Sequence, residues 1–207
     1  MDKTINNNNL KLSELNIRQH NIRGLELRKT QLDNYLNSNN IHLYLASESK
    51  LKINNLTKWG NLFHLKDYHV VNECAGNDWC GGVALLVGTG ILHDRIPLPD
   101  YSPVQIVGIR TKNLPLNLTV FSLYIPPISK DINEREVLKQ MKEICNMTTN
   151  YENVLIGGDF NASHPAWGSS SANKRGVNLY DMMEDPLESR RERKRLTALT
   201  WPGAPVD

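Results

Sequence analysis

Residues 154–170 have the sequence VLIGGDFNASHPAWGSS, the most informative segment of the chain. Its apolar start predicts a buried strand, which ends in two glycines and a polar segment. Asp159 and Asn161 are two positions apart, so on a strand both lie on one face while Phe160 turns toward the core. Such an acid and amide can orient a water molecule and donate to a phosphate oxygen. Taken alone, a polar turn in which both side chains bond the local backbone is the commoner explanation.

Apolar periodicity predicts further elements on both sides of this stretch. The expected strands are residues 10–17, 41–46, 81–87, 104–110, 118–125 and 153–160, and the expected helices are 25–40, 132–147 and 176–184. Long parts of the chain run from strand to strand without a helix between them. This order favours a mixed α/β sandwich over a strictly alternating parallel fold.

Three more candidate residues lie where predicted strands end. Glu48 follows strand 41–46, and one carboxylate with water and phosphate oxygens is enough to hold Mg²⁺. Asn21 could orient a metal ligand or contact a phosphate, and the Tyr124 hydroxyl could reach a phosphate oxygen. Each also has a structural alternative: an exposed acid, a turn-forming asparagine and an aromatic packed on the core. Their shared position at strand ends favours one common site.

The composition is that of an ordinary globular chain. Of 207 residues 40% are hydrophobic, and the formal net charge is +2, which permits a polyanionic partner without requiring one. Three scattered cysteines are too few for a disulfide framework or a zinc site. No signal peptide or membrane-spanning run is found. We therefore expect a nuclear or cytoplasmic monomer without membrane contact.

A family resemblance rests on the order of five motifs, NIRG, SESKL, GGVALLV, LYIPP and IGGDFNASHPAWGS. Together they resemble the endonuclease domain of non-LTR retrotransposons, in the endonuclease/exonuclease/phosphatase superfamily, over residues 10–184. The resemblance implies a four-layered, deoxyribonuclease I-like α/β sandwich. It also implies hydrolysis of DNA phosphodiesters with Mg²⁺ or Mn²⁺, within a larger polyprotein that carries a reverse transcriptase.

The resemblance also assigns roles to the five candidate residues. Glu48 would bind the metal, with Asn21 in the first metal-site motif. Tyr124 would contact the scissile phosphate, Asp159 would orient the attacking water, and Asn161 would hold the phosphate and its developing charge.

Two positions depart from the family pattern. Ser47 stands where the family often has Gln before the metal-binding Glu, and Pro127 replaces a phosphate-binding Asn of the repair enzymes. The closing Ser-Asp-His motif of the family does not occur in this chain, and no histidine follows His164. Its loss would make the domain incomplete and weak or inactive, since a general acid or base contributes about 10²–10⁴-fold to a rate. His164 lies on the wrong loop to replace it.

The two ends of the chain are predicted to lie outside this domain. Residues 1–9 are expected to be a disordered lead-in, and residues 185–207 a basic tail foreign to the family. The basic run at 190–195 supports an alternative function, a nucleic-acid-binding remnant without catalysis. A phosphatase of the same superfamily is a second alternative.

Overall fold

The computed structural model describes most of the chain. The described residues are 14–51, 56–57, 60–61, 63–73, 81–189 and 196–200. The predicted lead-in at residues 1–9 and the basic run at 190–195 lie outside them, so these two predictions stay untested.

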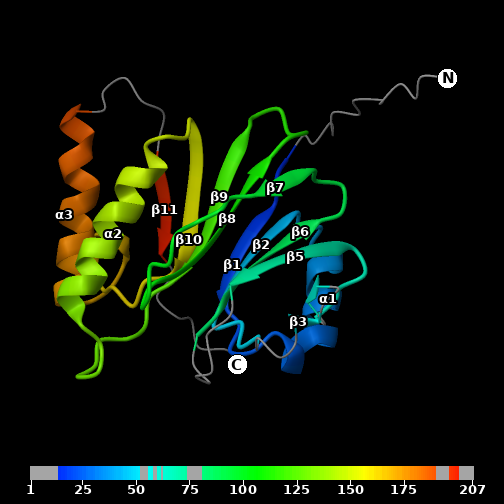
Figure 1. The fold of residues 1–207 in the computed structure, drawn as a ribbon, viewed down its shortest axis with the longest axis horizontal. Helices are drawn as coiled ribbons and strands as arrows, with labels where there is room; N and C mark the ends of the chain where they lie inside the picture. Colours follow the sequence, from blue (N-terminus) through cyan, green and yellow to red (C-terminus); the bar gives the residue numbers. More distant parts are fainter. Residues whose placement is uncertain are drawn as a thin grey trace.

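Two mixed β-sheets face each other and form the centre of the molecule (Figure 1). The four-stranded sheet has the order β1 (Ile17–Asn21), β2 (Leu43–Ser47), β6 (Val83–Gly88), β5 (Tyr68–Glu73). The five-stranded sheet has the order β11 (Leu196–Thr200), β10 (Asn153–Asp159), β9 (Leu118–Tyr124), β8 (Gln105–Thr111), β7 (His93–Arg95). A separate two-stranded pair joins β3 (Leu56–Thr57) to β4 (Gly60–Asn61).

Helices cover the outer face of each sheet. A 3-10 turn, η1 (Glu26–Arg28), leads into α1 (Lys29–Ser38), which lies against the four-stranded sheet. Helices α2 (Glu134–Thr148) and α3 (Lys174–Ser189) lie side by side against the five-stranded sheet (Figure 1). The sequence of helix, sheet, sheet and helix makes four layers, which confirms the predicted deoxyribonuclease I-like α/β sandwich.

Three apolar clusters fill the spaces between these layers, and the middle one holds the two sheets together. It contains Leu43 and Leu45 of β2 and Val120 and Leu155 of the opposite sheet. Gly157 lets the sheets approach closely, because a Cβ atom there would lie 2.7 Å from the Leu45 side chain. A Cβ on Gly158 would lie 1.8 Å from the Leu123 carbonyl oxygen. Gly158 is thus required by packing against backbone, whereas a side chain at Gly157 would have to displace the end of the Leu45 side chain.

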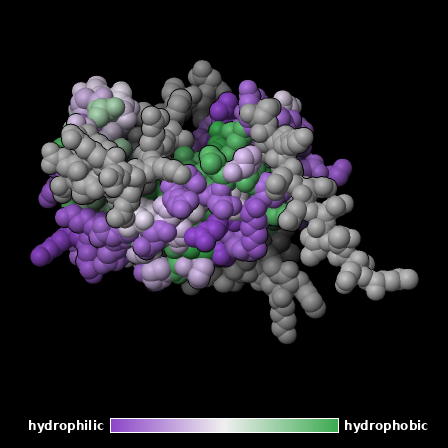
Figure 2. Space-filling model, turned by 90° about the horizontal axis from the view of Figure 1, so that it is seen from above, coloured by the Kyte–Doolittle hydropathy of each residue, from purple (hydrophilic) through white to green (hydrophobic). Residues whose placement is uncertain are grey.

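The chain direction brings several strand ends to one edge. β1 and β2 are parallel, as are β9 and β10, and the carboxyl ends of β1, β2 and β10 meet at the lower edge in Figure 1. Figure 2 views the opposite, upper end, where a hydrophilic surface surrounds a central hydrophobic area. The candidate residues therefore lie on the other end of the molecule.

The structure differs from the sequence prediction in three places. The first described strand is Ile17–Asn21; residues 14–16 of the predicted strand 10–17 are not in a strand, and residues 10–13 lie outside the described residues. Its sequence IRQHN has no apolar alternation because β1 is an edge strand whose side chains are half-buried or exposed. Short strands β5 and β7 have no clear sequence signal. In the predicted tail, α3 continues to Ser189 and β11 pairs in parallel with β10.

Candidate active site

The side chain of Asn21 joins two carboxylates at this shared edge. Asn21 ends β1, Glu48 follows β2 and Asp159 ends β10. The Asn21 Nδ2 atom donates to Glu48 Oε1 at 2.6 Å and to Asp159 Oδ2 at 2.8 Å. Three residues from two facing sheets thus form one polar group, which we call the edge triad.

The edge triad has the chemistry of a divalent-cation site. The Asn21 Oδ1 atom is buried and has no hydrogen-bond partner among the described residues. A buried polar atom without a partner is costly, and a cation would satisfy it. The Lys50 ammonium lies 3.8 Å from Glu48 Oε2 and is the positive charge now beside the triad.

The ligand types fit a hard cation such as Mg²⁺. Carboxylate and amide oxygens are its preferred protein ligands, and water and phosphate oxygens complete its shell. The described part of the chain contains no group of three or more His, Cys, Asp or Glu side chains placed to hold a metal. Glu48 and Asn21 would hold the ion directly, and the Glu48 side chain is 23% exposed and so open to it.

Two of the predicted residues have a left-handed backbone. Glu48 has φ of 52° and Asn161 has φ of 47°. This conformation costs a non-glycine residue roughly 1–2 kcal/mol, although Asn tolerates it better than Glu. Residues kept in such conformations cluster at functional sites, where the surrounding structure holds them. The strain at Glu48 agrees with a role in which the position of its carboxylate matters more than local stability.

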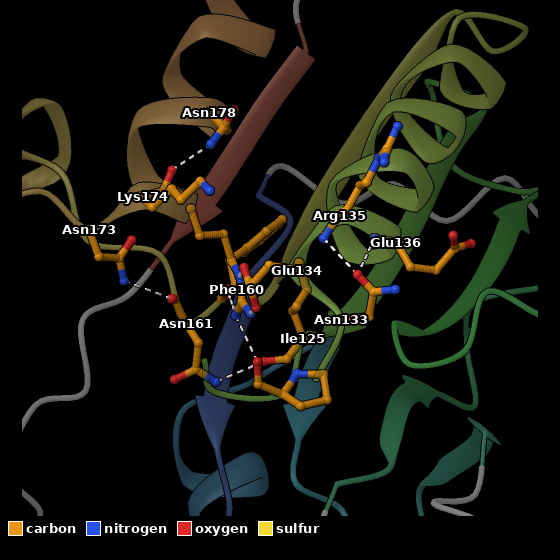
Figure 3. Close-up of polar contacts among 12 residues, drawn as sticks. Ile125, Asn133, Glu134, Arg135, Glu136, Phe160, Asn161, Asn173, Lys174 and Asn178 are labelled. Carbon is orange, nitrogen blue, oxygen red and sulfur yellow. Dashed lines mark hydrogen bonds and ion pairs between the residues drawn. The ribbon is translucent and has the colours of Figure 1, made fainter. Parts of the chain in front are cut away.

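Asn161 is tied to the triad through its neighbours. Its backbone N–H donates to Asp159 Oδ1 at 3.0 Å, and its Nδ2 donates to the Ile125 carbonyl at 2.8 Å. The Asn173 side chain in turn donates to the Asn161 carbonyl at 3.1 Å (Figure 3). These bonds fix Asn161 beside Asp159, and the second hydrogen of its side-chain amide has no partner in the described part of the chain.

Tyr124 lies beside Asp159 but its ring is part of the core. The two residues are partners in the parallel pairing of β9 and β10. Tyr124 is only 4% exposed and packs in the cluster between the sheets. The structure therefore shows the packed aromatic of the structural alternative, and any role at a phosphate is confined to the hydroxyl.

His164 begins a short 3-10 turn, η3 (Pro165–Trp167), and does not join the triad. Its Nδ1 accepts the N–H of Ala166 at 3.1 Å, so this nitrogen carries no proton. Its ring stacks on Tyr180 at a centroid distance of 4.5 Å and tilts against Trp167. A capping and packing role accounts for all of these contacts.

Arg175 is a structural residue that the sequence analysis does not identify. Its side chain is fully buried and forms an ion pair with Glu134, the first residue of α2. Its Nη1 donates to the Pro126 carbonyl at 2.7 Å and to the Phe160 carbonyl at 3.2 Å. Figure 3 shows Glu134, Phe160 and Ile125 converging at this point below the helices. Arg175 thereby holds together the chain segments that leave β9 and β10, directly before Asn161.

Comparison with known proteins gives relatives of one kind. A family described as "Endonuclease-reverse transcriptase" matches residues 118–198. The RNA-directed DNA polymerase from mobile element jockey of Drosophila melanogaster is 25% identical over 165 residues, and the Drosophila funebris protein is 27% identical over 164. These alignments cover 79% and 78% of this chain but 16% of each relative, so the chain spans about a sixth of their length.

Solved structures show the same fold. The endonuclease domain of TRAS1, a telomere-specific non-LTR retrotransposon, superposes with a TM-score of 0.59 and 22% identity, covering 81% of this chain and 70% of that one. The AP endonuclease LMAP from Leishmania major has a TM-score of 0.62 and 11% identity, covering 81% and 65%.

The fold and these matches make the chain similar to proteins of the endonuclease/exonuclease/phosphatase superfamily. Within this superfamily, the predicted resemblance to the endonuclease domain of non-LTR retrotransposons is confirmed. The matched family region reaches residue 198 and so includes part of the predicted tail. Across the described residues, no helix has both the length and the apolar character needed to cross a bilayer.

Proposed function

We propose that this chain hydrolyses phosphodiester bonds of DNA with a divalent cation, Mg²⁺ or Mn²⁺. The observation that carries the proposal is the edge triad, in which one amide joins two carboxylates beside an unpartnered oxygen. This oxygen-rich group lies where β1, β2 and β10 end. A bound cation would neutralise charge on the phosphate and on the leaving oxygen.

Each residue then has a distinct task. Glu48 and Asn21 hold the cation, and Asn21 also keeps Asp159 at a fixed separation from Glu48. The Asp159 carboxylate orients the attacking water and can take up its proton. Asn161 donates its remaining amide hydrogen to a phosphate oxygen, which stabilises the charge that develops there. Tyr124 contributes through its hydroxyl alone.

The rate is expected to be low. None of the histidines in the described residues has a hydrogen bond to a member of the edge triad. Protonation of the leaving oxygen then depends on water, and loss of one general acid typically slows a reaction about 10²–10⁴-fold. This observation also favours the second candidate function, binding of nucleic acid without turnover. With either function we place the domain in a larger protein with a reverse transcriptase, because its relatives are RNA-directed DNA polymerases.

The test is nicking of supercoiled plasmid with Mg²⁺ by the wild type, by Glu48→Gln and by Glu143→Gln. Glu143 lies on the exposed surface of α2, so its variant removes the same charge away from the site. We expect slow metal-dependent nicking that Glu48→Gln abolishes and Glu143→Gln retains. Binding that weakens with salt, without any nicking, would support the second candidate. Equal nicking by both variants would contradict the site.

A further inference from the structure

We propose that Ser47 is a positioning residue that links the two sheets and sets the separation of Glu48 and Asp159. Ser47 ends β2 and directly precedes Glu48. Side chains at alternate positions of a strand share a face, so Ser47 points the same way as Leu43 and Leu45. These two leucines lie in the cluster between the sheets. The hydroxyl therefore closes the active-site end of that apolar layer.

The Ser47 hydroxyl both donates and accepts a hydrogen bond to the facing sheet. It donates to the Leu123 carbonyl at 3.2 Å and accepts the backbone N–H of Asp159 at 3.0 Å. Leu123 belongs to β9 and Asp159 to β10, so one oxygen atom ties the end of β2 to two strands of the opposite sheet. The residue is fully buried, so water does not compete for these bonds.

The backbone of Ser47 also links β2 to the chain segment that carries Asn21. Its carbonyl accepts the N–H of Ile22 at 3.0 Å, and its Cα pairs in register with Asn21. Ser47 is thus bonded at Asp159, adjacent to Glu48 in the chain and paired with Asn21. Loss of the hydroxyl would leave the sheets packed by leucines but would release the backbone of Asp159 from β2.

This role goes beyond the family pattern, in which a larger Gln often occupies the position. The two sheets already approach closely beside this position, since a Cβ atom on Gly157 would lie 2.7 Å from the Leu45 side chain. The short hydroxyl of Ser47 matches the close approach that Gly157 allows. The two residues together define how far apart the metal-binding and water-orienting carboxylates lie.

The chain offers a matched control in Ser122. It is fully buried on β9, and its Oγ atom has no hydrogen-bond partner among the described residues. Ser122→Ala therefore removes the same atom from the same apolar layer without breaking a bond between the sheets. Ser47→Cys keeps the size of the Ser47 side chain but weakens both hydrogen bonds, and it serves if Ser47→Ala does not fold.

Two measurements on each variant distinguish a residue that positions the two carboxylates from one that only stabilises the fold. The first is the NMR signal of the Asn21 side-chain NH₂ group, whose two hydrogens report the two carboxylates without metal. The second is the affinity for Mn²⁺, which rests on the proposed function. We expect Ser47→Ala to shift the Asn21 signals and to weaken Mn²⁺ binding about 10-fold or more, because ligand-orienting partners typically contribute that much. Ser122→Ala should change neither.

The outcomes are distinct. Unchanged Asn21 signals in Ser47→Ala, or equal changes in Ser122→Ala, would overturn the positioning role. Shifted Asn21 signals in a chain whose wild type neither binds Mn²⁺ nor nicks DNA would support positioning by Ser47 and would refute the proposed function. Shifted signals with weaker Mn²⁺ binding in Ser47→Ala and Ser47→Cys alone would support both.

Discussion

Asn21 and Asp159 lie 138 residues apart in the chain, and a hydrogen bond of 2.8 Å joins their side chains. The bond crosses from the edge strand of one sheet to an interior strand of the other. Asn21 shares the same nitrogen with Glu48, so neither carboxylate can move without affecting the other. The predictions below follow from this group and from the buried contacts that support it.

Replacing Glu48 by glycine should leave the fold more stable than replacing it by alanine, and either change should remove the metal site. Its left-handed φ of 52° is unfavourable for a glutamate and free of cost for glycine. We expect the free energy of unfolding of Glu48→Gly to exceed that of Glu48→Ala by about 1 kcal/mol. Both variants should lose Mn²⁺ binding. Urea unfolding and Mn²⁺ titration check this, and a glycine variant less stable than the alanine variant would contradict the strain.

Removing the Tyr124 hydroxyl tests the one role left to this residue. The buried ring stays in Tyr124→Phe, so the unfolding midpoint should change little. If the hydroxyl binds the phosphate, the nicking rate should fall about 10- to 150-fold, since a hydrogen bond to a charged group contributes about 1.5–3 kcal/mol. Tyr151→Phe is the control, because its ring packs on Phe121 and Arg110 before β10 begins. Equal rates for wild type and Tyr124→Phe would assign Tyr124 to the core alone.

Replacing the buried Arg175 should lower the free energy of unfolding more than replacing an exposed helical residue. Arg175→Met leaves Glu134 without its partner and the carbonyls of Pro126 and Phe160 without a donor. Breaking a buried ion pair in this way typically costs about 3–5 kcal/mol. Arg135→Met, on the exposed side of α2, should cost less than about 0.5 kcal/mol. Urea unfolding of both variants measures the difference, and similar losses would show that the buried contacts contribute little.

Stability should rise with pH through the range where histidine titrates. Burial lowers the pKa of His20, with the Arg18 charge adding to it, and burial also lowers the pKa of His42. Both groups titrate at about 6.5 in the unfolded chain, which therefore binds more protons than the folded chain near pH 6. The free energy of unfolding should thus increase from about pH 5 to 7 and level off above.

The variant that tests this dependence is His20→Gln combined with His42→Gln. It should flatten the pH profile of stability, measured by thermal unfolding at each pH. The contacts agree with neutral rings, since His42 Nδ1 accepts the N–H of Asn16 at 3.0 Å and so carries no proton. If the stability of the double variant rises equally steeply with pH, groups other than His20 and His42 control the pH dependence.

The sequence predicts the edge triad better than it predicts the strands that carry it. Asn21, Glu48 and Asp159 are polar residues next to strand ends, and parallel strands place such ends at one edge. The strand β1 itself has the sequence IRQHN, in which edge exposure removes the apolar alternation. The sequence therefore indicates Asn21 as a candidate site residue although it does not indicate the bounds of β1.

Arg175 and Ser47 show what a sequence cannot reveal in physical terms. An arginine at the start of a helix is expected to point to solvent, yet its partner Glu134 is 41 residues upstream and its other partners are backbone carbonyls. The Ser47 hydroxyl bonds Asp159, which is 112 residues away, across a space set by Gly157 and Leu45. Both contacts depend on the distance between layers, which local patterns do not encode.

The most direct test of the central claim is a crystal structure of this chain with Mn²⁺ and a short DNA oligonucleotide, using the anomalous signal to locate the metal. We predict a peak about 2.1 Å from a Glu48 carboxylate oxygen, next to Asn21, with a phosphate oxygen completing its shell and Asp159 facing the phosphorus. A metal bound elsewhere, or DNA bound away from the edge triad, would contradict the account.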